Sequence, residues 1–168
     1  MLKVSTWVLR ALVVLNFLVG VPLLLLFGYT FVAEAKFLET LGKLNIGMDL
    51  PLLLASARWL LAIAAPVMLF AHLLFRRLLA ILRTVEEGEP FVAANAERLR
   101  VVAWCLLAIQ LCDIGFGIAA TAFDTAAGER TSGWSPGITG WVAVLLVFVL
   151  ARVFREGTRL RTEADLTI

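Results

Sequence analysis

Four long apolar runs constrain this 168-residue chain more than any other feature. They cover residues 7–33, 50–75, 101–122 and 136–154, and charged residues gather in the connections between them. Each run is close to the roughly 20 residues that a helix needs to cross a hydrocarbon core. Lipid offers no water to free backbone groups, so a run of this kind must be helical. The sequence therefore predicts an all-α membrane protein, a single domain over residues 1–168 with four transmembrane helices.

The composition also separates the chain from ordinary soluble domains. Hydrophobic residues make up 61% of the chain and charged residues 17%, whereas about a quarter of the residues in soluble domains are charged. Ala33-Glu34-Ala35 resembles a signal-peptidase site, but the apolar run before it exceeds the roughly 7–15 residues of a signal-peptide core. We therefore interpret the first run as a retained membrane anchor.

The distribution of lysine and arginine predicts the orientation of the helices. The amino end, the central connection and the carboxyl tail contain eleven of the 15 basic residues, the first and third loops contain three, and Arg58 lies inside a span. The side richer in basic residues is expected to be cytoplasmic, so both chain ends should lie inside the cell. Four tryptophans near span ends agree with this arrangement, because indoles favour the headgroup zone. They are Trp7, Trp59, Trp104 and Trp134.

The connection between the second and third spans is predicted to form a cytoplasmic helical hairpin. Apolar residues repeat at helical spacing from Leu78 to Val85, so the second span should continue beyond the membrane. Gly88 then ends one helix and Pro90 opens the next turn. A helix should restart after Phe91 and lead into the third span.

Ionisable residues inside the spans are candidates for function, because a charge in lipid is costly. Arg58 in the second span and Asp113 in the third lie at depths that an arginine side chain can bridge. They could form an intramembrane ion pair that acts as a polar switch or contacts a ligand. Alternatively, Arg58 reaches the outer headgroups and Asp113 bonds a neighbouring helix. Both interpretations stay open.

The sequence offers little for catalysis or cofactor binding. His72 is the single histidine, so one subunit cannot form a bis-histidine haem site, and no cluster has metal-ligand spacing. Cys105 and Cys112 lie about 10 Å apart along a helix, too far for a disulfide. Glycine-flanked serines, paired carboxylates and phosphate-binding loops are absent. We expect no enzyme activity, cofactor, metal or direct binding of nucleic acid.

Two segments combine unusual turns with a fixed distance from a span. They are Gly88-Glu89-Pro90-Phe91 with Asn95-Ala96-Glu97-Arg98-Leu99-Arg100, and Leu150-Ala151-Arg152-Val153-Phe154-Arg155-Glu156-Gly157 with Leu160 and Asp165-Leu166-Thr167-Ile168. They resemble the central and carboxyl-terminal signatures of a bacterial family of four-helix membrane proteins, catalogued as a domain of unknown function. Arg152 departs from the pattern, since that family often has an acidic residue there.

Members of this family are often encoded beside a small helix-turn-helix regulator of the phage-repressor type. The resemblance therefore implies a membrane protein that regulates or tethers a transcription factor. Under this hypothesis a cytoplasmic partner surface is formed by Gly88, Pro90, Phe91, Asn95 and Arg98, with Phe91 as an apolar anchor among polar residues. Alternatively, Gly88 and Pro90 only shape a tight reversal and Phe91 enters the membrane interface.

Two further functions stay open from the sequence. One is an accessory or structural subunit of a membrane complex, and the other is a small transporter or immunity-type protein. Gly115 and Ala119 lie four residues apart in the third span, a spacing that permits close helix contact. This spacing is compatible with a homodimer and with packing inside one chain.

Overall fold

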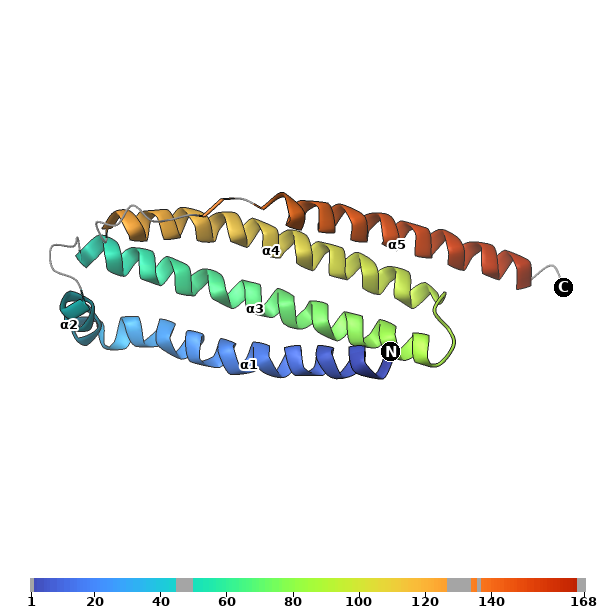
Figure 1. Ribbon diagram of the computed structural model, residues 1–168, viewed down its shortest axis with the longest axis horizontal. Helices are drawn as coiled ribbons and strands as arrows, with labels where there is room; N and C mark the ends of the chain where they lie inside the picture. Colours follow the sequence, from blue (N-terminus) through green and yellow to red (C-terminus); the bar gives the residue numbers. More distant parts are fainter. Residues whose placement is uncertain (1, 45–49, 127–133, 136, 166–168) are drawn as a thin grey trace. The chain divides into compact units, whose positions relative to one another are not determined.

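The computed structural model describes residues 2–44, 50–126, 134–135 and 137–165. Within these ranges the chain contains five helices and no strand. The helices are α1 (Leu2–Val32), α2 (Glu34–Leu44), α3 (Leu50–Glu86), α4 (Ala93–Ala126) and α5 (Ile138–Asp165) (Figure 1). The predicted all-α class is confirmed.

Four of these helices are long and apolar enough to cross a membrane. They contain the candidate spans Lys3–Val32, Leu50–Glu86, Ala93–Ala122 and Ile138–Arg161. The four predicted spans are thereby confirmed, and the chain has the architecture of a multi-pass membrane protein. Helical structure continues past several predicted span ends, because a helix satisfies its backbone in water as well as in lipid. Pro136, the predicted start of the fourth span, lies outside the described residues.

The surface of α1 shows what surrounds these helices. Large apolar side chains are exposed along its length, from Trp7 through Leu25 to Val32, which is 89% exposed. Water would penalise so much bare apolar surface, whereas lipid tails are as apolar as the side chains themselves. These side chains are therefore expected to contact lipid.

The helix α2 was not anticipated, because the charged residues between the first two spans were interpreted as a loop. It is short and amphipathic, with Phe37 and Leu38 half-buried. On its exposed face Lys43 Nζ lies 2.6 Å from Glu39 Oε1, an i,i+4 ion pair. The helical spacing of the apolar residues in this segment could have predicted α2, but the high content of charged residues favoured a loop instead.

Contacts divide the chain into two compact units. Unit 1 comprises Met1–Asn16, Leu69–Gln110 and Gly137–Ile168, and unit 2 comprises Phe17–Met68 and Leu111–Pro136. Unit 1 thus contains both chain ends and the α3–α4 connection. The single-domain organisation stays a prediction, and each unit is described separately.

The core of unit 1 is made by α3, α4 and α5. Leu74, Val102 and Cys105 are buried at its centre, and half-buried apolar side chains such as Phe70 and Val147 pack around them. Close to this core, Gly140 of α5 lies against the end of the Gln110 side chain, which would have to move to admit a Cβ. The absence of a side chain at Gly140 thus allows α5 to approach α4 closely.

The predicted helical hairpin is present in unit 1. Gly88 follows α3 with φ +82°, a left-handed conformation that glycine adopts without steric cost. The Gly88 N–H donates to the Val85 carbonyl at 3.1 Å, and the Glu89 N–H donates to the Thr84 carbonyl at 2.9 Å. This pair of bonds is a Schellman motif, which satisfies the last carbonyls of a helix. Gly88 therefore ends α3 as the sequence predicted.

Candidate functional site

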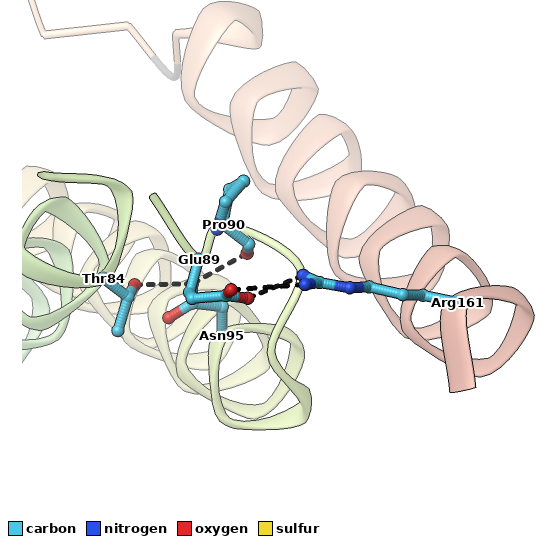
Figure 2. A network of polar contacts seen from close by, with 5 residues as sticks. All are labelled: Thr84, Glu89, Pro90, Asn95 and Arg161. Atoms are coloured by element: carbon cyan, nitrogen blue, oxygen red, sulfur yellow. Dashed lines mark hydrogen bonds and ion pairs between the residues drawn. The ribbon is translucent and has the colours of Figure 1, made fainter. Parts of the chain in front are cut away.

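A polar network centred on Asn95 lies beneath the α3–α4 turn. The Asn95 side chain is 0% exposed. Its Nδ2 donates to Thr84 Oγ1 at 2.7 Å and to the Pro90 carbonyl at 2.9 Å (Figure 2). Its Oδ1 accepts from Arg98 Nη1 at 2.8 Å. A buried amide needs partners for its polar atoms, and here the two arms of the reversal supply them.

Arg98 extends this network to the body of α3. The same Nη1 also donates to the Ala80 carbonyl at 3.1 Å, and the side chain is half-buried. The partner surface stays a prediction, but the structure gives two of its five residues a role within the hairpin itself. Asn95 and Arg98 point into the hairpin and hold it together, and a fully buried Asn95 offers nothing to a partner in this conformation. Sequence spacing did not reveal this, because the partners belong to two different helices.

An ion pair joins the α3–α4 turn to the end of α5. Arg161 Nη1 lies 2.6 Å from Glu89 Oε2, and Nη2 lies 3.2 Å from Glu89 Oε1 (Figure 2). Hydrogen bonding from Arg161 and its positive charge lower the pKa of the Glu89 carboxyl below its ordinary range. Both side chains are partly exposed to solvent, so the pair contributes modestly to stability.

Two aromatic rings make a second contact between the same segments. The ring centroids of Phe91 and Phe154 are 5.4 Å apart with an interplanar angle of 32°. Gly157 lies beside them, where a Cβ would be 3.5 Å from Phe91 Cδ1. Phe91 nevertheless remains 45% exposed. We call the Glu89–Arg161 pair and the Phe91–Phe154 contact together the clasp.

In unit 2, Arg58 of α3 contacts the end of α1 and Glu34, the first residue of α2. Its Nη2 donates to the Thr30 carbonyl at 2.6 Å and to Glu34 Oε2 at 2.8 Å, and its Cζ lies 4.2 Å from the Phe31 ring centroid. The ion-pair partner of Arg58 in this structure is thus Glu34, whereas the sequence left open a pair with Asp113 or a position among the outer headgroups. Glu34 was counted only as a loop charge in the sequence, although an arginine side chain can reach the end of a span.

Asp113 lies half-buried on α4 and forms no ion pair with any residue that the structure describes. Close to it, α3 and α4 line an apolar cavity of about 680 Å³ in unit 2 that is open to the outside, with Trp59 and Ile118 exposed at its edge. Gly115 and Ala119 line this cavity together with Ser56 and Cys112, whereas Asp113 and Arg58 do not. The small residues of the third span therefore border open space here.

The remaining candidates stand apart from one another. Cys105 is buried in unit 1 and Cys112 is half-buried in unit 2, and both are free thiols. His72 is half-buried on α3. Within the described ranges, no group of three or more histidine, cysteine or acidic residues is placed to hold a metal ion.

Comparison with known families decides the classification. A family model described as "Protein of unknown function (DUF2975)" matches residues 8–168. The chain belongs to this family. No curated protein and no solved structure matches it. Both segments that suggested the resemblance lie within the matched residues of this DUF2975 protein, and the clasp brings them into contact; Leu166, Thr167 and Ile168 of the second segment lie outside the described residues.

Proposed function

We propose that this DUF2975 protein is a non-enzymatic regulator in the bacterial inner membrane that holds a cytoplasmic helix-turn-helix transcription factor. The observation that supports this most is the clasp, in which two segments distant in sequence meet at a polar turn. Phe91 supplies one of the two rings in the apolar contact of the clasp, and it is still 45% exposed. A partly exposed aromatic ring among charged residues is typical of the anchor of an interface.

The charge of unit 1 favours a cytoplasmic position for this surface. Its residue ranges contain eleven basic and seven acidic residues, a net charge of +4, whereas those of unit 2 contain four basic and six acidic residues, a net charge of −2. Basic residues flanking membrane spans favour the cytoplasmic side. A soluble DNA-binding protein would meet the α3–α4 turn and the end of α5 on that side.

The clasp also offers a way to release a partner. A regulator needs an element with two states whose populations a signal can change. In the closed state α5 contacts the turn through one exposed ion pair and one pair of rings. Exposed ion pairs are weak, so the end of α5 can leave the turn without unfolding the hairpin, which the buried Asn95 network maintains.

The first step of the test is to find the helix-turn-helix regulator that the proposal expects beside the gene of this chain, and the second is to capture it with the tagged full-length protein in membranes. Phe91→Ala should reduce capture by about tenfold or more, as expected for an aromatic anchor. Phe116→Ala is the matched control, because Phe116 is the same residue type with the same 45% exposure and lies on α4 in unit 2. Equal capture by both variants and the unchanged chain would argue strongly against the proposal.

The same experiment separates the alternatives. An accessory subunit would recover other membrane proteins in fixed ratio and leave the soluble regulator behind. A transporter of polar solutes would need a polar path. The cavity described in unit 2 is apolar and is not lined by Arg58 or Asp113, so it does not favour that function.

A further inference from the structure

A second concave surface, this one in unit 1, lies between the first turns of α4 and the last turns of α5. Its volume is about 260 Å³. Ala93 and Ala96 contribute small apolar walls, and Ala96 is buried. The remaining lining residues are Glu97, Arg155, Thr158 and Arg159. We call this surface the α4–α5 groove.

The charges around the α4–α5 groove do not balance. Each described glutamate near it is paired with an arginine: Glu97 with Arg100 at 2.9 Å, Glu156 and Glu163 with Arg159 at 3.5 and 3.1 Å, and Glu89 with Arg161 at 2.6 Å. Arg152 and Arg155 are left over, since neither forms an ion pair with any residue in the described part of the chain. These five arginines and four glutamates carry a net charge of +1, because Arg159 pairs with two glutamates, and Arg155 is the unpaired arginine that lines the groove.

The position of Arg155 along α5 places this charge near the membrane boundary. The fourth apolar run ends at residue 154, and Arg155 is the next residue of α5, about 1.5 Å further along the helix, from where its long side chain can reach the headgroups. Headgroups occupy roughly 5–8 Å on each side of the hydrocarbon core. On α4 the groove residues Ala93 and Ala96 likewise precede the apolar run that starts at Val101. The groove therefore lies at the depth of phospholipid headgroups.

Apolar side chains continue from the groove toward the lipid. Leu145 is exposed and Phe148 is half-buried on α5, and both lie on the side of this helix that carries Arg152 and Arg155. An acyl chain can lie along these two side chains and the exposed Trp104 of α4, whose ring contacts Phe148, while its headgroup remains near Arg155. Arginine is suited to the other end of such a ligand, because its planar guanidinium binds phosphate through two parallel hydrogen bonds.

We propose that the α4–α5 groove binds an anionic phospholipid, with Arg155 holding the headgroup phosphate, Arg152 adding charge, and Leu145 and Phe148 contacting the acyl chain. The inference goes beyond the proposed function and does not depend on it. Arg152, which stands where the family often has an acidic residue, thereby acts as a cation at the headgroup. A headgroup bound in the groove would also contact α5, whose end the clasp joins to the α3–α4 turn.

The test uses the full-length protein in an uncharged detergent, with phosphatidylglycerol or phosphatidylcholine of the same acyl chains added. Native mass spectrometry should show preferential retention of phosphatidylglycerol. Arg155→Gln should weaken that binding by about tenfold, as expected for a lost charge-assisted contact. Arg155→Lys should keep part of the preference. Arg83→Gln is the control and should bind as the unchanged chain does, because Arg83 is exposed in the same unit but does not line the groove.

Three results would overturn the proposal. The first is equal retention of both lipids, and the second is equal loss in Arg83→Gln and Arg155→Gln. The third is displacement of the lipid by millimolar inorganic phosphate, which would indicate a site for a soluble anion. If Arg155→Gln instead abolished capture of a protein partner and left lipid retention intact, the groove would be a protein-docking surface. Circular dichroism of each variant confirms that its helices are intact.

Discussion

Glu89 and Arg161 form a two-point ion pair across 72 residues of sequence, and they thereby connect the turn after α3 with the last turns of α5. Both side chains are about half exposed, so they meet only when the end of α5 lies against the α3–α4 turn. The pair therefore reports on whether the end of α5 lies on the turn, and this makes it the most direct place to test the clasp.

Reversal of one charge in this pair should free the end of α5. Glu89→Arg and Arg161→Glu each place like charges together, so residues 152–165 should exchange amide hydrogens faster in either variant. The double exchange Glu89→Arg/Arg161→Glu should restore much of the protection, because it recreates an opposite-charge pair. Hydrogen exchange with mass spectrometry measures this, and protection in the double variant no better than in the single ones would contradict the ion pair.

Acid should open the same contact. Arg161 lowers the pKa of the Glu89 carboxyl, so the stabilisation is present at neutral pH, above the pKa of an unpaired glutamate. It is lost as the pH falls through the lowered pKa of the paired group. Spin labels at Glu87→Cys and Leu160→Cys, with Cys105 and Cys112 replaced by alanine, should report a longer or broader distance at acid pH. Glu89→Gln should make this distance insensitive to pH over the same range, and an unchanged pH response in that variant would place the titrating group elsewhere.

Gly88 and Gly42 form a matched pair for backbone conformation. A Cβ at either position would meet nothing within 4 Å, but only Gly88 has a positive φ. Gly88→Ala should therefore destabilise the hairpin by about 1–2 kcal/mol through backbone strain alone. Gly42→Ala lies within α2 and should be neutral or stabilising by about 0.5–1 kcal/mol. Thermal unfolding in detergent compares the two, and equal effects would show that φ at Gly88 is unimportant.

Arg58 should couple to Glu34 and not to Asp113. A double-mutant cycle with Arg58→Gln and Glu34→Gln should give a coupling energy of roughly 0.2–1 kcal/mol, as for other partly exposed pairs. The corresponding cycle with Asp113→Asn should give a value close to zero, because the structure places no ion pair there. A larger coupling with Asp113 would restore the intramembrane pair that the sequence suggested.

The sequence was sufficient for those features that depend on neighbouring residues. Apolar length predicted the four spans, and the Gly88–Pro90 pattern predicted the reversal after α3, because both follow from local backbone chemistry. The sequence did not predict which residues of different helices contact one another. Asn95 was expected at a surface because it is polar, yet its hydrogen bonds to Thr84 and the Pro90 carbonyl bury it. Polarity does not show whether water or protein satisfies an amide.

The partner of Arg58 illustrates the same limit. Depth along two spans made Asp113 available, but depth does not fix the direction in which a side chain leaves its helix. Glu34 lies just past the end of α1, and the flexible arginine side chain reaches it and the Thr30 carbonyl together. The choice between two carboxylates was made by helix rotation, which no spacing in the sequence reveals.

The bare flank of α1 has an evolutionary consequence. A side chain whose neighbours are fluid hydrocarbon tails has no fixed shape to match, so leucine, valine, isoleucine and phenylalanine are interchangeable there. Gly20 and Thr30 are different, because both are buried: Gly20 lies against the Met68 side chain, which would have to move to admit a methyl group, and the Thr30 carbonyl accepts from Arg58. Distant members of the family should therefore have drifted freely along the exposed side of the first helix and varied less at these two positions.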